Sequence, residues 1–255
     1  MKRSSLRKQL YLLFLFAFTI ACFTAVPTFA APIVGPAGMA FYDKPATIPG
    51  THGTLIKYRT STSVPPGAPS CYSWTIMYAS QDALGVPNVV TGTVLVPKTL
   101  WNYGLTARPI ISYAVGTHGL AQSWAPSIQL ENGTDYENSN IKAALDKGYA
   151  VVITDNPGFT NGDVPSYMVG IAQGKAVLDI VTAATQIPYI SLKSYAKVGI
   201  WGYSQGGQSA AWAGQLQPTY ASGIKLAGVA AGGVPAELFA VGRYLDGNNG
   251  SSFLL

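Results

Sequence analysis

One short stretch of this sequence has the spacing of a catalytic serine. Residues 202–206 read G-Y-S-Q-G, between an apolar run at 198–201 and a helix-compatible run of small residues that we expect to end at Pro218. A strand, a sharp turn and a helix in this order are typical of the nucleophile elbow of serine hydrolases. Ser204 is therefore the candidate nucleophile. The backbone N–H of Gln205, unpaired at the start of the helix, is a candidate oxyanion donor.

The pentapeptide by itself is a weak signal. The chain has 28 Gly among its 255 residues, so a chance G-x-S-x-G is expected in roughly one such chain in four. Its position between an apolar run and a small-residue helix gives the prediction its weight. The alternative is a glycine-rich turn in which the serine has no chemical role.

Two further apolar runs predict strands that lead toward the same site. Residues 109–115 and 149–154 are continuous apolar runs, as expected for strands buried on both faces. In open α/β sheets the chemistry gathers beyond the carboxyl ends of the strands. The first run leads to His118 and Gly119, on the loop that supplies the second oxyanion donor in this class; a surface loop with an exposed histidine is the alternative. The second run ends at Asp155, interpreted as a turn or cap residue.

The remaining patterns predict an α/β fold with a mainly parallel sheet and flanking helices. We expect a hairpin at the sheet edge formed by residues 74–79 and 89–96. Two helices are expected at 138–147 and 167–187, and a last strand at 226–233. Residues 31–72 are rich in Pro, Gly, Ser and Thr, which indicates an arm with little regular structure.

The first thirty residues predict a secretory signal peptide. The first eight carry four positive charges and no acid, and residues 10–23 are almost wholly apolar. This pattern predicts a signal peptide at 1–30, cleaved after Ala30, and a mature hydrolase domain at 31–255. A retained membrane anchor is the alternative, although the apolar run is short for a bilayer span.

Without that leader the chain has almost no net charge. The full sequence has 16 Lys+Arg and 11 Asp+Glu, and four of the basic residues lie in the leader, which leaves 12 − 11 = +1. The balance therefore implies no nucleic-acid partner. A composition that is 48% hydrophobic, with 15 Tyr, suits an apolar substrate. Cys71 is the single cysteine of the mature part, either awaiting a partner or held as a buried thiol.

The spaced motifs together resemble the secretory lipases, the lipase-A-like α/β-hydrolases of fungi and bacteria. The segments that carry the resemblance are 116–119, 125–127, 148–155, 201–207 and 228–238. It extends from about Phe41 to about Leu245 and implies an α/β-hydrolase fold that cleaves carboxylic esters, acylglycerols above all. It also implies secretion, a lipid or other ester substrate, and transient contact with a lipid–water interface. We expect no cofactor and no metal.

The sequence departs from this family in its triad. Such folds order their triad as Ser, then Asp or Glu, then His. Both histidines, His52 and His118, precede Ser204. The only acidic residues that follow it are Glu237 and Asp246. We therefore expect an N-terminal portion of a lipase that lacks the lid, the acid and the histidine and is inactive alone. The alternative is a non-catalytic hydrolase-fold protein that binds acyl or aromatic ligands.

Overall fold

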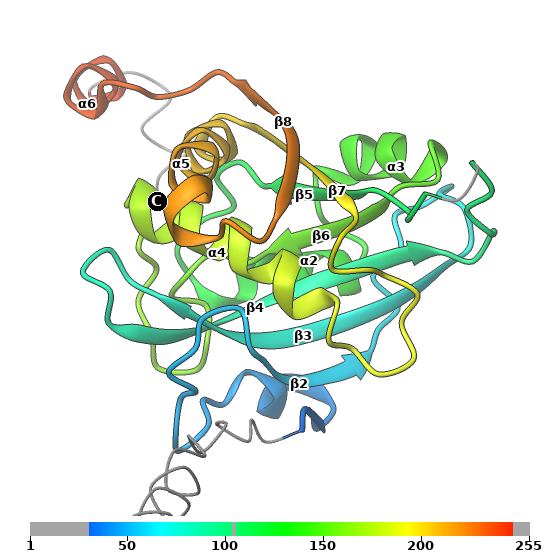
Figure 1. Ribbon diagram of the computed structural model, residues 1–255. Coiled ribbons are helices and arrows are strands. Elements are labelled where there is room, and N and C mark those ends of the chain that lie inside the picture. Colours follow the sequence, from blue (N-terminus) through cyan, green and yellow to red (C-terminus); the bar gives the residue numbers. More distant parts are fainter. Residues whose placement is uncertain (1–30, 104–105, 247–255) are drawn as a thin grey trace, which may run out of the picture. The chain divides into compact units, whose positions relative to one another are not determined.

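A computed structural model describes residues 31–103 and 106–246, and its described strands form one eight-stranded sheet (Figure 1). The strands are β1 (Ile33–Val34), β2 (Leu55–Thr60), β3 (Cys71–Gln81), β4 (Pro87–Pro97), β5 (Ile110–Ala114), β6 (Ala150–Thr154), β7 (Lys197–Tyr203) and β8 (Lys225–Gly232). Their order is β1-β2-β3-β4-β6-β5-β7-β8. Four pairings, β1–β2, β5–β6, β5–β7 and β7–β8, are parallel and the other three are antiparallel.

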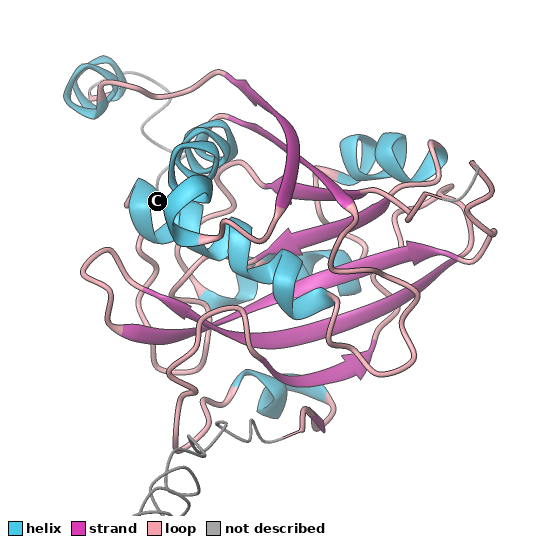
Figure 2. Ribbon diagram, viewed as in Figure 1, coloured by secondary structure: helices cyan, strands magenta, loops and turns pink. Residues whose placement is uncertain are grey.

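Helices cover both faces of this sheet, so the predicted α/β class is confirmed (Figure 2). They are the 3-10 helices η1 (Gly38–Tyr42) and η2 (Gln122–Trp124) and the α-helices α2 (Pro126–Glu131), α3 (Asn138–Asp146), α4 (Gly170–Ala184), α5 (Gln205–Tyr220) and α6 (Leu238–Leu245). Alternate residues of β6 join different cores. Val152 packs in the cluster with α4 and α5, whereas Val151 and Ile153 pack in the cluster with α2 and α3. This two-sided burial explains the continuous apolar run of β6.

The two helices behind the elbow, α4 and α5, pack unusually closely. A Cβ placed on Gly170 would lie 2.1 Å from the indole of Trp212, and one on Gly174 would lie 2.8 Å from the backbone nitrogen of Ala213. Glycine at these positions therefore lets the helices meet. Helix α4 is shorter than the predicted 167–187 by three residues at each end. At its start, Met168 has a left-handed φ of +61°, which is incompatible with a helix that begins at residue 167.

The predictions for the N-terminal segment need correction. Residues 31–72 contain β2, which pairs antiparallel with β3, and β1 pairs with β2 in turn. The predicted hairpin exists as β3 and β4, but it lies inside the sheet, not at its edge. Packing explains the difference: Leu55 of β2 is buried, and Phe41 and Tyr42 fill a core against Met77. In β2 the burial does not follow the apolar residues: the charged Lys57 is buried, whereas Ile56 and Tyr58 are only partly buried.

The expectation that Pro218 would end the elbow helix is wrong. Helix α5 runs to Tyr220 with Pro218 in its last turn. Proline costs a helix most in the interior, where it removes a hydrogen bond and clashes with the preceding turn. Here the backbone N–H of Ala221 still donates to Gln217 O at 3.0 Å, so the helix closes after the proline.

Three smaller observations complete the description. The predicted signal peptide lies outside the described residues. Within the described part, no helix combines the length and the apolar character needed to cross a bilayer. Cys71 is a free, half-buried thiol there, and burial raises its pKa to about 11. The thiol is therefore protonated and unreactive at neutral pH.

Candidate active site

The strand–turn–helix predicted around Ser204 is present. Ser204 joins β7 to α5 with φ +58° and ψ −123°, a backbone conformation that non-glycine residues rarely adopt. Its backbone N–H donates to Gly232 O at 3.0 Å, which ties the turn to β8. The strained turn lifts the serine out of the sheet at the carboxyl end of β7.

Three glycines make this turn sterically possible. A Cβ on Gly202 would lie 2.3 Å from Gly206 O, one on Gly206 would lie 2.0 Å from Ala114 O, and one on Gly207 would lie 2.1 Å from Gly232 O. Each distance is a clash with backbone, which cannot move aside as a flexible side chain can. The G-x-S-x-G-G spacing is therefore a packing requirement of the elbow and not only a sequence signature.

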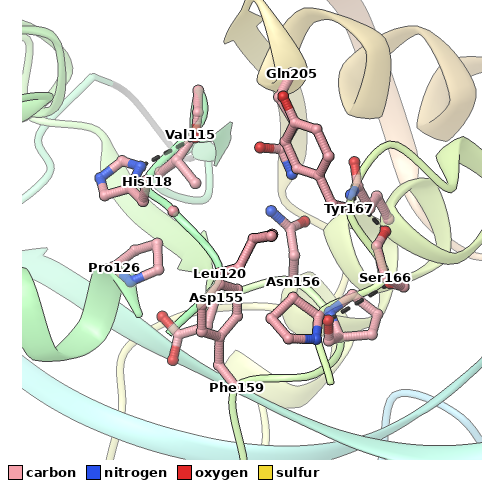
Figure 3. A pocket seen from close by; sticks show the side chains of 15 residues that line it. Val115, His118, Leu120, Pro126, Asp155, Asn156, Phe159, Ser166, Tyr167 and Gln205 are labelled. Atoms are coloured by element: carbon pink, nitrogen blue, oxygen red, sulfur yellow. Dashed lines mark hydrogen bonds between the residues drawn. The ribbon is translucent and has the colours of Figure 1, made fainter. Parts of the chain in front are cut away.

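The start of α5 leaves backbone donors open. The first intrahelical hydrogen bond runs from Gln208 N to Ser204 O at 3.1 Å, and the N–H of Gln205 has no acceptor among the described residues. Figure 3 shows the pocket that Gln205 lines together with His118. Gly119 also lines this pocket, so three of the predicted site residues come together. The cavity is about 10 Å³, roughly the space of one water.

His118 lies in the loop after β5 with both ring nitrogens occupied. Its Nδ1 donates to Gly116 O at 3.0 Å, and its Nε2 donates to the Asp135 carboxylate at 3.0 Å. Burial lowers the pKa of His118, but the hydrogen bond and charge of Asp135 outweigh burial, and the pKa lies above its ordinary value. Because both partners are acceptors, the ring carries both protons and has no free lone pair. The alternative of an exposed histidine is excluded, since its side chain is only 4% exposed.

Two buried carboxylates, Asp135 and Glu137, hold the loop that carries His118 by hydrogen bonds. Asp135 also accepts from the backbone N–H of Glu137 at 2.7 Å. Glu137 in turn accepts from Gly116 N at 2.9 Å and from the Tyr113 hydroxyl at 2.5 Å. Sequence reasoning missed both acids, because they lie in a polar segment with no periodic pattern. Their burial and pairing become visible only in three dimensions.

Gly119 adopts a conformation that few other residues could. Its φ is +112°, and a Cβ there would lie 3.0 Å from the ring of Trp124. The backbone N–H groups of residues 117–119 donate to no acceptor in the described structure. The loop therefore presents unpaired donors beside the elbow, held by the contacts of His118 and Gly116.

Neither histidine is placed to activate the serine. No described side chain hydrogen-bonds Ser204 Oγ, and His118 uses both nitrogens elsewhere. His52 lies in the loop before β2, where its Nδ1 contacts Asp179 at 2.6 Å. The elbow and the donor loop come together, but a general base for Ser204 is absent from the described residues.

Asp155 has the structural role expected for it. Its carboxylate accepts from the backbone N–H of Ser127 in the first turn of α2 at 2.7 Å, and from the hydroxyls of Ser127 and Thr91. Burial raises the pKa of Asp155, although these hydrogen bonds oppose the shift. The acid satisfies the open donors of a helix start and is not available to orient a histidine.

Comparisons with known proteins agree with this geometry. The model of a family described as "Secretory lipase" matches residues 121–254. Lipase 4 of Candida albicans is 32% identical over 256 residues, 94% of this chain and 52% of that protein. The secreted triacylglycerol lipase LIP7 of Malassezia globosa is 31% identical over 169 residues, 63% of this chain and 34% of that protein.

Solved structures give the same result. Candida antarctica lipase A in its closed state aligns with a TM-score of 0.66 and 28% identity, over 80% of this chain and 47% of that one. The rice cell wall degrading esterase LipA from Xanthomonas oryzae aligns with a TM-score of 0.56 and 22% identity, over 76% and 53%, which supports the fold alone. The chain spans about half or less of the length of these curated and solved relatives.

Proposed function

The chain belongs to the secretory lipase family, and on that premise we propose that it carries the nucleophile of a secreted serine hydrolase. The substrates would be carboxylic esters, acylglycerols above all. The observation that carries the proposal is the elbow itself. Ser204 sits on a turn with φ +58°, next to the open N–H of Gln205. Strained backbone conformations of this kind cluster at functional sites, which favours a catalytic serine over a turn without a chemical role.

In the proposed reaction, Ser204 Oγ adds to the ester carbonyl carbon and its proton passes to a base. The carbonyl oxygen takes the negative charge and lies against the N–H groups of Gln205 and of residues 117–119. When the C–O bond breaks, the alcohol leaves with that proton and the acyl group stays on Ser204. Water then attacks the acyl-enzyme, which releases the carboxylic acid and restores the serine hydroxyl.

The base must reach Ser204 Oγ within hydrogen-bond distance. The chain has two histidines, and both His52 and His118 are held by aspartates away from this hydroxyl. We therefore propose that the described residues alone do not turn over esters, and that the triad acid and histidine come from outside them. Loss of triad members typically leaves only a residual ~10³–10⁴-fold advantage over water.

Exposed apolar side chains surround the mouth of the site. Leu120 and Trp124 are each 50% exposed and Tyr203 is 63% exposed. Leu120 lines the pocket, Trp124 packs on Gly119, and Tyr203 precedes the nucleophile. We propose that these side chains make transient contact with a lipid–water interface, so that the ester reaches Ser204 without crossing water.

The nucleophile is tested with a fluorophosphonate probe and a short-chain ester. The full chain should neither label nor turn over the ester, whereas a chimera that adds the C-terminal half of Candida albicans lipase 4 should do both. Ser204→Ala in the chimera should abolish labelling and hydrolysis, and the control Ser222→Ala, at an exposed serine, should leave both intact. Most of the kcat surviving in the Ser204→Ala chimera would sink the assignment.

The donor loop is tested in the same active chimera. If a backbone N–H of the loop holds the oxyanion, Gly119→Pro should lower kcat by ~10²–10³ with little change in KM. His118→Ala should cost less, because that ring positions the loop without touching the substrate. Near-neutral effects of both changes would place the oxyanion donors elsewhere.

A non-catalytic role is the second candidate, favoured by the absence of a described base near Ser204. In that case the chain would bind acyl or aromatic ligands without cleaving them. Failure of the chimera to label, while the chain still binds an uncleavable ester analogue competitively with a fatty acid, would favour this alternative.

A further inference from the structure

The second histidine–aspartate pair borders a separate cavity, and we propose that this cavity binds a short aliphatic carboxylate. The pair lies at the opposite ends of the strands from the elbow. The cavity is lined by Ile110, the first residue of β5, and Val198, near the start of β7, whereas Ser204 follows the last residue of β7. The proposal does not depend on any role of Ser204.

One nitrogen of His52 is fixed and the other is free. Nδ1 contacts the Asp179 carboxylate at 2.6 Å, and the ring stacks on Tyr220 with centroids 4.0 Å apart. Nε2 makes no hydrogen bond within the described structure. Asp179 is only 1% exposed, whereas the His52 side chain is 31% exposed. The aspartate therefore orients a ring whose second nitrogen remains available to a ligand.

The charge of Asp179 is satisfied by hydrogen bonds from neighbouring side chains. Besides His52, it accepts from the Ser80 hydroxyl at 2.7 Å and from the Tyr220 hydroxyl at 2.8 Å. Asp179 does not line the cavity. With three hydrogen-bond partners on its two oxygens, the carboxylate is satisfied within the described structure and repels an incoming anion little.

The loop that carries His52 is held by hydrogen bonds to Gln186, just beyond α4, and to Ala79 of β3. Gln186 donates from its side-chain amide to Gly53 O at 2.6 Å and accepts from Leu55 N at 3.0 Å. Gly53 N donates to Ala79 O at 2.8 Å, and Ala79 N donates to Thr54 O at 2.9 Å. His52 is therefore preorganised at the cavity, and a ligand would pay little to order it.

The cavity combines a buried aliphatic floor with a polar, cationic rim. Its volume is about 220 Å³. The floor consists of buried aliphatic side chains: Ile110, Val181, Ala196, Val198 and Ile224. The polar side chains that line it are His52, Thr182, Thr185, Lys193 and Ser194. Of the described residues that line the cavity, none is an acid.

These features select one ligand chemistry. An aliphatic floor suits an alkyl chain, while the Lys193 ammonium, in a lining without acids, suits an anion at its end. The volume lies below the ~300–1,000 Å³ of pockets for drug-sized ligands, so the chain must be short. A monocarboxylate such as hexanoate matches the size, the apolar floor and the charge together.

The test uses the full chain with carbon-13-labelled histidine, because only two histidines are present. Titration with hexanoate should shift the ring signals of His52 with a Kd of about 1 mM. The signals of His118, whose nitrogens are both occupied, should not move and serve as an internal control. Hexanol, which has the same chain without the charge, should bind at least about fivefold more weakly.

Matched variants separate the charge from the cavity. Lys193→Met keeps the aliphatic stem and should weaken hexanoate binding about fivefold. Lys147→Gln, at an exposed lysine just after α3 that does not line the cavity, should change nothing. His52→Asn keeps a donor where Nδ1 stood but removes the atom corresponding to Nε2. Ligand-observed NMR should show that hexanoate binds this variant more weakly. The midpoint of its unfolding transition verifies that the variant is folded.

Three results would overturn the proposal. They are no shift of the His52 ring at saturating hexanoate, equal affinity for hexanoate and hexanol, and equal weakening by Lys193→Met and Lys147→Gln. The first would mean an empty structural cavity, the second a merely apolar one, and the third a diffuse effect of surface charge. None of them bears on Ser204, so the proposed ester hydrolysis would be unaffected.

Discussion

The two histidines of this chain sit in clusters of the same composition but different availability. Each ring stacks on a tyrosine and pairs with a buried aspartate: His118 with Tyr136 and Asp135, His52 with Tyr220 and Asp179. In the first cluster a backbone carbonyl takes the second nitrogen. In the second cluster that nitrogen is open. The contrast shows that a histidine–aspartate pair is not a function in itself. The partner of the other ring nitrogen decides whether the pair has a structural role or can bind a ligand.

Removing the aspartates should break the two clusters unequally, and this is the largest effect we expect. Asp135→Ala leaves a charged ring with a 4% exposed side chain, so it should lower the free energy of unfolding by about 3–5 kcal/mol. Asp179→Ala removes the partner of His52, which is accessible to water, and of the Ser80 and Tyr220 hydroxyls. We expect it to lower the free energy of unfolding by about 1–3 kcal/mol. Urea unfolding of the full chain measures both. An equal or reversed order would remove the distinction between the clusters.

The pH dependence of stability sharpens the same contrast. The pKa of His118 in the folded chain lies above 6.5, its ordinary value. The folded state therefore holds this proton more tightly than the unfolded state. The resulting stabilisation is complete below about pH 6.5 and is lost as the pH rises through the folded value. While that proton leaves, the free energy of unfolding should fall by up to about 1.4 kcal/mol per pH unit.

Asp135→Asn isolates this contribution from other titrating groups, such as the nearby Glu137. An asparagine at 135 can donate to a neutral His118 ring, so the cluster stays paired without the extra proton. Unfolding of both proteins between pH 6 and 9 should give a slope in the parent chain that the variant lacks. The same slope in both would assign the proton to another group.

The tyrosine hydroxyls give the smallest predicted difference. The Tyr220 hydroxyl donates to the buried Asp179 carboxylate, so Tyr220→Phe should cost about 1–2 kcal/mol. The Tyr136 hydroxyl donates to Thr117 O on a residue that is 58% exposed, so Tyr136→Phe should cost about 0.5 kcal/mol or less. Thermal or urea unfolding of the pair compares them. Equal losses would mean that the two clusters are buried alike.

The elbow was predictable because its signal is local. The glycines around Ser204 are required by contacts among three strands (β5, β7 and β8) and helix α5, but the strand–turn–helix that carries them is one continuous segment. The loop with His118 was also predictable, since it follows a strand whose buried character shows in its composition. In both cases the residues that give the signal are neighbours in the sequence.

The remainder depends on contacts between distant segments. Asp135 and His118 are separated by seventeen residues, and Asp179 and His52 by 127. No local pattern announces such pairs. Strand β2 was missed for a related reason: its partner β3 and its core neighbours, not its own alternation, make it a strand. Pro218 shows the opposite error: a strong local rule failed because the proline lies in the last turn of α5, where it costs a helix less than in the interior.

The strand order has a consequence for synthesis on the ribosome. Strand β4 pairs with β6 and not with β5, which lies beyond β6 in the sheet. The hairpin β3–β4 can close as soon as it emerges, whereas β5 must wait for β6, which ends forty residues later at Thr154. At about 5–20 residues per second, this leaves an apolar strand without its neighbour for roughly 2–8 s. During that interval Ile110 and Ile111 of β5 stay exposed next to an incomplete sheet. We therefore expect a chaperone that binds unfolded chains to recognise this segment of the nascent chain.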